Sequence, residues 1–307
     1  MIPEFLVTHS GGFHADELLS SVVLTRLFPQ AVIVRSRAPE WITPGANRII
    51  YDVGGAYDAE AGIFDHHQRG APLRDDGQPY SSFGLIWKHF GHDYLAAIGL
   101  PEAHIEPVYA SLDESFVLPI DLMDNGAMSP AVAGPLAVLT LPVLLETLKP
   151  VFDETDPEAL ERAFGDALTI ARSFLEARIA GSAAKLRAED LVLQAISTAG
   201  ENRVLELPMG MPFRPAIMKA GADHLLFVVH PRDKDWCRTL ICLITEVRGG
   251  RTSSCEGVIR RRRRSFDSNA RARFRAGKRF SIRSETTTII RCSFTSMGSS
   301  NGITASG

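Results

Sequence analysis

Apolar residues in the first 64 positions form short runs that polar and glycine-rich segments separate. Such runs lie within residues 5–7, 31–36, 48–51 and 61–64, and each is bounded by Pro, Gly or polar residues. Short apolar runs with these boundaries are typical of buried strands. The segment 15–27 has helical apolar spacing, at Leu18, Leu19, Val22, Val23 and Leu27. Alternating strand and helix predicts an α/β fold with a parallel sheet.

From residue 81 the pattern becomes helical. Ser81 or Ser82 can cap a helix that Gly99 ends. A second helix is predicted from about residue 104 to Asn125-Gly126, which would leave Asp124 at the helix end, free to face a site. Residues 130–150 contain four prolines and are predicted to form a connection with one short helix.

A long amphipathic helix is predicted over residues 157–199, followed by a smaller α+β unit. Its predicted elements are strands at 203–207, 225–230 and 240–244 and a helical turn at 213–220. The chain is therefore expected to divide into an N-terminal α/β domain at 1–150, a C-terminal lobe at 151–248 and an irregular basic tail at 249–307.

Composition describes a globular protein, with 45% hydrophobic and 22% charged residues. The sequence has no apolar stretch near the ~18 residues of a membrane span and no secretory pattern at its start, so we expect a cytoplasmic protein without a membrane partner. Residues 236–307 hold 14 Arg and one Lys against four acids, or +11; the total of −3 leaves −14 for residues 1–235.

The basic tail permits three interpretations. Its five consecutive arginines, Arg260 to Arg264, are followed by Arg- and Ser-rich sequence without a period of 2 or 3.6. Out-of-frame translation of a GC-rich gene is the favoured interpretation, a disordered native tail the second, and a nucleic-acid-binding arm the third. All four cysteines lie within residues 236–307 without CxxC spacing, which supports neither a zinc site nor a disulfide framework.

Residues with metal-binding chemistry follow three of the apolar runs. They are His9, His14, Asp16, Asp52, Asp65, His66 and His67. Each group alone could be a turn or a solvated loop, but strand ends in a parallel sheet converge on one crevice. Imidazoles and carboxylates without a thiol favour Mn²⁺ or Mg²⁺ over a structural zinc. The helix that starts at residue 15 would direct free N–H groups at the same place and favour an anion such as phosphate.

Five segments together resemble one known family, the melanocyte-proliferating-gene (MYG) exonucleases, whose bacterial members are often labelled metal-dependent protein hydrolases. The segments are Thr8–Glu17, Asp52–Asp58, Phe64–Arg69, Ser82–Gly91 and Ile120–Gly126. The resemblance is strong to about residue 130 and looser to about Trp236. It also implies Pro-Trp-Gly and Phe-Val-His segments near the end, which this chain lacks.

The family resembles a branch of the DHH phosphoesterases, in which a related residue set holds two metal ions. This resemblance implies a ligand set of His9, His14, Asp16, Asp52, His66 and Asp124, with Asp121 as a rival to Asp124. Many DHH enzymes have Asp where His14 stands, a difference that could alter the metal preference.

Two ions ~3.5–4 Å apart can stabilise both the attacking and the leaving oxygen of an in-line displacement at phosphorus. Asp52 is the candidate bridge between them, because one carboxylate can span two cations. We expect His66 to bind a metal and His67 to contact the scissile phosphate or the leaving group. Asp65 is expected to orient these groups without binding a metal itself. Three arginines are candidate phosphate contacts or else surface charges: Arg35, Arg37 and Arg69.

The leading hypothesis is a metal-dependent phosphodiesterase that acts from the 3′ end of RNA or a short oligonucleotide, with the polarity implied only by the family resemblance. The acidic body favours a small or single-stranded substrate over a duplex. Alternatives are hydrolysis of a small phosphate ester or pyrophosphate, and a non-catalytic metal-binding module associated with RNA. A protease is disfavoured because the chain has no His-Glu-x-x-His helix.

Overall fold

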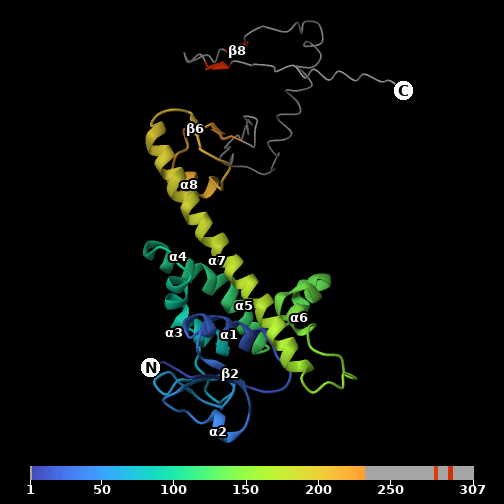
Figure 1. The fold of residues 1–307 in the computed structure, drawn as a ribbon. Helices are drawn as coiled ribbons and strands as arrows, with labels where there is room; N and C mark the ends of the chain where they lie inside the picture. The colour runs from blue at the N-terminus through green and yellow to red at the C-terminus, as the bar shows by residue number, and fades with distance from the viewer. Residues whose placement is uncertain (1, 232–279, 283–289, 293–307) are drawn as a thin grey trace, which may run out of the picture.

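The computed structural model describes residues 2–231, 280–282 and 290–292, and its N-terminal part is built on a five-stranded sheet (Figure 1). The strand order is β2-β1-β3-β5-β4. The first four of these run parallel, and β4 pairs antiparallel with β5 at the edge. The strands are β1 (Phe5–Thr8), β2 (Val32–Arg35), β3 (Arg48–Tyr51), β4 (Tyr57–Asp58) and β5 (Ile63–Phe64). The predicted parallel-dominated α/β fold is confirmed.

The helix α1 (Ala15–Leu27) has the predicted bounds and is buried along most of its length, including Asp16 and Glu17 in its first turn. It packs against α3 (Ser82–Ala97), whose N-terminus is capped by the Ser81 hydroxyl, as predicted. A short helix α2 (Pro39–Ile42) follows β2. Because α1 contacts both the sheet and α3, its two buried acids lie inside the main core.

The second predicted helix is a nearly continuous helical rod of three segments. They are α4 (Glu102–Leu112), a π-helical turn η1 (Asp113–Val117) and α5 (Leu118–Asp124). Asn125 follows with helical dihedral angles, and Gly126 takes the left-handed φ of 66° that stops the helix. Asp124 is therefore the last residue of α5, as predicted.

Two short helical segments replace the one predicted between residues 130 and 150. These are η2 (Pro130–Leu139), interrupted by Gly134 with a φ of 57°, and α6 (Leu141–Glu146). Pro135 and Pro142 explain the interruptions, because proline removes a backbone donor and is tolerated mainly in the first turn of a helix.

The 41-residue helix α7 (Ala159–Ala199) takes part in two hydrophobic cores (Figure 1). Its N-terminal part packs on the main core through side chains at helical spacing: Phe164, Ala167, Ala171, Leu175, Ile179 and Ala183. Its other end packs through Val192 on a small unit of β6 (Val204–Glu206), α8 (Arg214–Lys219) and β7 (Phe227–Val229). The two strands pair in parallel with α8 between them in sequence, which is a β-α-β connection rather than the predicted α+β arrangement. The division at residue 150 stays a prediction.

The predicted strand at 240–244 and nearly all of the basic tail lie outside the described residues. Two short tail strands, β8 (Phe280–Ile282) and β9 (Ile290–Cys292), pair antiparallel. Within the part of the chain that the structure describes, no helix is both long and apolar enough to cross a membrane.

Candidate metal centre

The polar residues that follow β1, β3 and β5 lie side by side because these three strands are parallel neighbours in the sheet. His9 follows β1, Asp52 follows β3, and His66 comes two residues after β5. The first turn of α1 adds Asp16, and the end of α5 adds Asp124. Five segments that are distant in sequence therefore meet at the carboxyl edge of the sheet, where α/β proteins place their sites.

Asp52 lies at the centre of this cluster. It is buried, and it is the one non-glycine residue among those described with a positive φ, 55°. Asp is one of the few residues that tolerates this conformation, which clusters at functional sites. The Asp52 N–H donates to the Ser82 hydroxyl at 3.0 Å and to the Phe64 carbonyl at 3.3 Å, so α3 and β5 hold the strained backbone in place.

The two carboxylate oxygens of Asp52 face two different imidazoles. Oδ2 lies 3.2 Å from Nε2 of His9, and Oδ1 lies 3.5 Å from Nε2 of His66. Asp52 therefore contacts two histidines of the cluster through separate oxygens.

His66 directs one ring nitrogen at three carboxylates. Its Nε2 lies 3.1 Å from Oδ2 of Asp124, 3.5 Å from Asp52 and 3.8 Å from Oδ2 of Asp16. This nitrogen is buried and has no hydrogen-bond partner of acceptable geometry. A buried polar atom without a partner needs an explanation, and a cation among these oxygens supplies one.

Near His9 the structure adds a residue that the sequence analysis did not consider, Glu17. Its carboxylate is fully buried, accepts the His14 N–H at 2.8 and 2.9 Å, and places Oε1 3.1 Å from Nε2 of His9. The spacing of Glu17 three residues after His14 is a helix-capping signal, which accounts for one of its two contacts. Nδ1 of His9 faces the Ser10 carbonyl at 3.2 Å. The carbonyl can only accept, so Nδ1 donates and Nε2 is left to the carboxylates.

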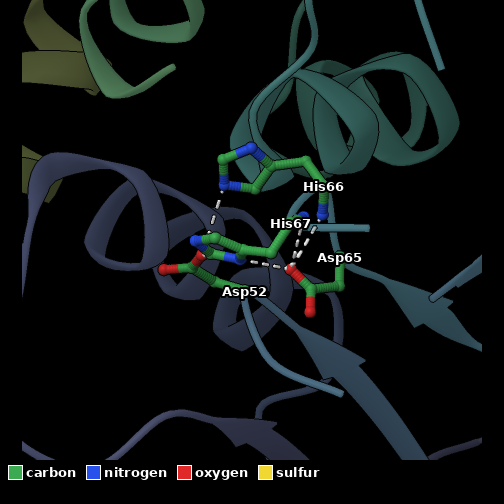
Figure 2. A group of neighbouring side chains, drawn as sticks. All are labelled: Asp52, Asp65, His66 and His67. Atoms are coloured by element: carbon green, nitrogen blue, oxygen red, sulfur yellow. Dashed lines mark hydrogen bonds and ion pairs between the residues drawn. The ribbon is translucent and has the colours of Figure 1, made fainter. Parts of the chain in front are cut away.

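Asp65 and His67 form a pair at the edge of the cluster (Figure 2). Oδ1 of Asp65 lies 2.7 Å from Nδ1 of His67 and accepts the N–H of His66 at 2.8 Å, while Oδ2 accepts the N–H of Gly55 at 2.6 Å. The His67 side chain is 60% exposed, whereas that of His66 is 4% exposed. Asp65 therefore fixes the loop and the ring of His67, and the two adjacent histidines occupy different environments.

The cluster creates a strong demand for positive charge. Burial alone would lower the pKa of His9, but the carboxylates of Asp52 and Glu17 outweigh it and raise the pKa to about 10. In the same way, Asp124 and Asp52 outweigh burial and raise the pKa of His66 to about 11. Burial, together with the charges of Asp124 and Asp52, raises the pKa of Asp16.

Imidazole nitrogens and carboxylate oxygens without sulfur match a hard or borderline divalent ion. Three groups of residues each bring their donor atoms within 4.8 Å of one another. The groups are Asp16, His66 and Asp124; His9, His14 and Glu17; and Asp52, Asp65, His66 and His67. The residues present therefore fit a divalent metal.

Two residues from the predicted site have other partners. Asp121 accepts from the Ser81 N–H at 3.1 Å and pairs with Nη2 of Arg74 at 2.7 Å, and it belongs to none of the three groups. Arg35 has a buried side chain that pairs with Glu161 of α7 at 2.8 Å and donates to the Gly11 carbonyl. Asp121 and Arg35 thus hold segments together around the cluster rather than pointing into it.

A cavity of about 650 Å³ opens over the cluster. His9, His14, Asp16, Asp52, His67 and Asp124 line its polar side, together with Ser10 and Arg37. Met123, Pro130, Pro142 and Val143 form an apolar wall, with Glu146 beside it. This volume lies within the ~300–1,000 Å³ typical of small-molecule sites. Of the three candidate arginines, Arg37 alone lines the cavity; Arg69 is exposed outside it.

Comparison with known proteins identifies the family. Residues 5–246 match the model of MYG1_exonuc, described as an uncharacterised protein family (UPF0160). This chain belongs to the MYG1 family. The match includes every candidate ligand and runs past Trp236 to residue 246.

Several MYG1 proteins of eukaryotes are similar to the chain. MYG1 protein C694.04c of Schizosaccharomyces pombe is 34% identical over 226 residues, which cover 68% of each protein. The human MYG1 exonuclease is 32% identical over 68% of this chain and 60% of its own length. The bovine MYG1 exonuclease is 36% identical over 56% of this chain and 48% of its own. The matches thus span about half to two thirds of the relatives. No solved structure matches the chain.

Proposed function

We propose that this MYG1-family chain is a metal-dependent phosphodiesterase that removes nucleotides from the 3′ end of RNA or a short oligonucleotide, with two Mn²⁺ ions, or Mg²⁺ in their place. The observation that carries the proposal is Asp52, a strained, buried carboxylate whose oxygens face His9 and His66 separately. The MYG1 exonuclease names of the human and bovine relatives support nuclease chemistry.

In this proposal the donors divide into two sets around Asp52. His9, with His14 and Glu17 beside it, would hold one ion, and His66, Asp16 and Asp124 would hold the other. Bound divalent ions supply an activated water and stabilise the charge that develops on phosphoryl oxygens. Oδ1 of Asp16 also accepts the N–H of Phe83 at 2.5 Å and the Ser81 hydroxyl at 2.8 Å, so the N-terminus of α3 orients this carboxylate.

His67 is the candidate to act on the leaving oxygen. Its hydrogen bond to Asp65 raises its pKa above the usual value, and burial opposes this only partly, which favours the doubly protonated ring. With Nδ1 held by Asp65, Nε2 is the nitrogen available to donate to a phosphate or a leaving oxygen in the cavity. Arg37, on the same cavity, is the candidate contact for a neighbouring phosphate.

The shape and charge of the site favour a strand end over a duplex. Four acidic residues line the cavity: Asp16, Asp52, Asp124 and Glu146. Residues 1–235 carry a net charge of −14. Binding to duplex DNA or RNA depends mainly on Lys and Arg at phosphates. The apolar wall of Met123, Pro130, Pro142 and Val143 offers a base or sugar a non-specific surface.

The test uses single-stranded RNA and DNA oligomers labelled at the 5′ end, incubated with the metal-free protein plus Mn²⁺, Mg²⁺ or EDTA. We expect a ladder of 5′-labelled products that shorten by one nucleotide at a time with Mn²⁺ and no cleavage with EDTA. Release of a labelled mononucleotide as the first product would show instead that degradation starts from the 5′ end. Hydrolysis of pyrophosphate or of mononucleotides alone would select the small-substrate alternative. Metal binding without any hydrolysis would select the non-catalytic module.

A further inference from the structure

We propose that Asn125 is a positioning residue that fixes the ring of His66 in the tautomer that can bind a metal. The inference rests on the proposed metal centre, but it concerns a residue outside the ligand set. Asn125 directly follows Asp124, and its side chain bridges three segments of the site.

The orientation of the Asn125 amide follows from its partners. Nδ2 donates to the Tyr80 carbonyl at 3.1 Å and to the Asp121 carbonyl at 2.9 Å. Carbonyl oxygens only accept, so a flipped amide would place oxygen against oxygen at both contacts. The nitrogen therefore faces these carbonyls, and Oδ1 faces Nδ1 of His66 at 3.1 Å.

The amide oxygen in turn determines which ring nitrogen of His66 carries the proton. Oδ1 can only accept, so Nδ1 of His66 must donate to it. In the neutral ring, Nε2 then carries the lone pair, and this nitrogen points at Asp16, Asp52 and Asp124. The opposite tautomer would place a proton on Nε2, 3.1 Å from Oδ2 of Asp124. That proton would occupy the lone pair that a metal ion requires.

Helix termination does not explain why Asn stands at 125. Its φ of −75° and ψ of −1° are open to any residue, and the left-handed turn belongs to Gly126. The side chain instead connects the end of α5 to His66 and to Tyr80, the residue before the Ser81 cap of α3. Because Ser81 also contacts Asp16, Asn125 lies at the junction of the segments that carry three candidate ligands.

The experiment compares the full-length chain with Asn125→Ala, Asn125→Asp and, as a matched control, Asn202→Ala. Asn202 accepts a backbone N–H in the turn after α7, in the small unit. Mn²⁺ affinity of the metal-free proteins is measured by calorimetry, and thermal melting checks folding. Loss of a group that orients a metal ligand typically lowers metal affinity by about 10–100-fold. We expect such a loss in Asn125→Ala, little change in Asn202→Ala, and a smaller loss in Asn125→Asp, which keeps an acceptor for Nδ1 but places an oxygen against the Tyr80 and Asp121 carbonyls.

A second measurement needs no variant. Ring ¹⁵N spectra of the wild-type chain with Mg²⁺ should show His66 protonated at Nδ1. A proton on Nε2, or an Asn125→Ala affinity within twofold of wild type, would overturn the inference while leaving the metal centre in place. A wild-type chain that binds no Mn²⁺ would instead contradict the proposed function.

Discussion

Replacing Asp52 by Asn is the most informative single change in this molecule. Asn has the same shape and also tolerates a positive φ, so the backbone at 52 and its bond to the Ser82 hydroxyl should persist. Asp52→Asn removes only the negative charge and one oxygen that faces an imidazole. A defect in this variant would therefore report on charge and ligation rather than on backbone strain.

The expected loss of activity is large. Divalent ions supply several kcal/mol of transition-state stabilisation, and about 1.4 kcal/mol corresponds to a tenfold change in rate. If the amide no longer supports the ions, a loss of about 4 kcal/mol lowers kcat by about 10³-fold. Both oxygens of Asp52 lie within 3.5 Å of an imidazole nitrogen, so the loss should affect both metal positions.

The variant should also lose stability. Burial opposes ionisation of Asp52, but the imidazoles of His66 and His9 lower its pKa below the usual value, so its charge stabilises the metal-free fold at neutral pH. A hydrogen bond to a charged group contributes roughly 1.5–3 kcal/mol. We therefore expect a lower Tm for Asp52→Asn, with an unchanged far-ultraviolet circular dichroism spectrum.

The assay follows Mn²⁺-dependent cleavage of a labelled single-stranded RNA under single-turnover conditions, with Asp58→Asn as the control for a surface carboxylate. Asp58 lies on β4 and is exposed. Asp52→Asn with a rate within tenfold of wild type at saturating Mn²⁺ would refute Asp52 as the shared ligand.

Further predictions concern the other members of the cluster. His67→Ala should lower kcat at least about 10²-fold. It should leave Mn²⁺ affinity unchanged, because the ring is exposed and held by Asp65. Weakened Mn²⁺ binding in calorimetry would instead indicate that His67 is a metal ligand. Asp124→Asn should weaken Mn²⁺ binding. Asp121→Asn should keep the affinity and lower stability by about 1–3 kcal/mol, because Arg74 loses one of its two carboxylate partners and keeps Asp113; the reverse pattern in melting and calorimetry would make Asp121 the ligand. Nearby carboxylates raise the pKa of His9 and His66 above neutrality, so Mn²⁺ binding at pH 7 should release protons and tighten as pH rises. Calorimetric binding heats that do not depend on the buffer's ionisation enthalpy would contradict this prediction.

Local sequence signals were sufficient to place most elements that carry the site. Apolar runs and their boundaries predicted β1, β3 and β5, and the Ser81 cap predicted the start of α3. Once the strands are parallel neighbours, convergence of the residues after them follows from topology. This is why His9, Asp52 and His66 could be grouped before the structure was known.

Tertiary partners were not visible in the same signals. Asp121 and Asp124 are three residues apart on one helix, so periodicity places them on a similar face; Arg74, from a distant loop, distinguishes them. Arg35 and Arg37 are two residues apart, so an extended segment would place them on the same side. Only Arg35 of these two pairs with Glu161 of α7. In the sequence, the positions of Glu17 and Asn125 are typical of the first turn and the end of a helix. The contact of Glu17 with His9 and that of Asn125 with His66 depend on packing between segments.

The most direct test of the central claim is anomalous diffraction from crystals of this chain grown with Mn²⁺. The account predicts two manganese peaks about 3.5–4 Å apart, one beside His9 Nε2 and one beside His66 Nε2, with the two oxygens of Asp52 each bound to a different peak. A single peak, or two peaks that do not share Asp52, would contradict it.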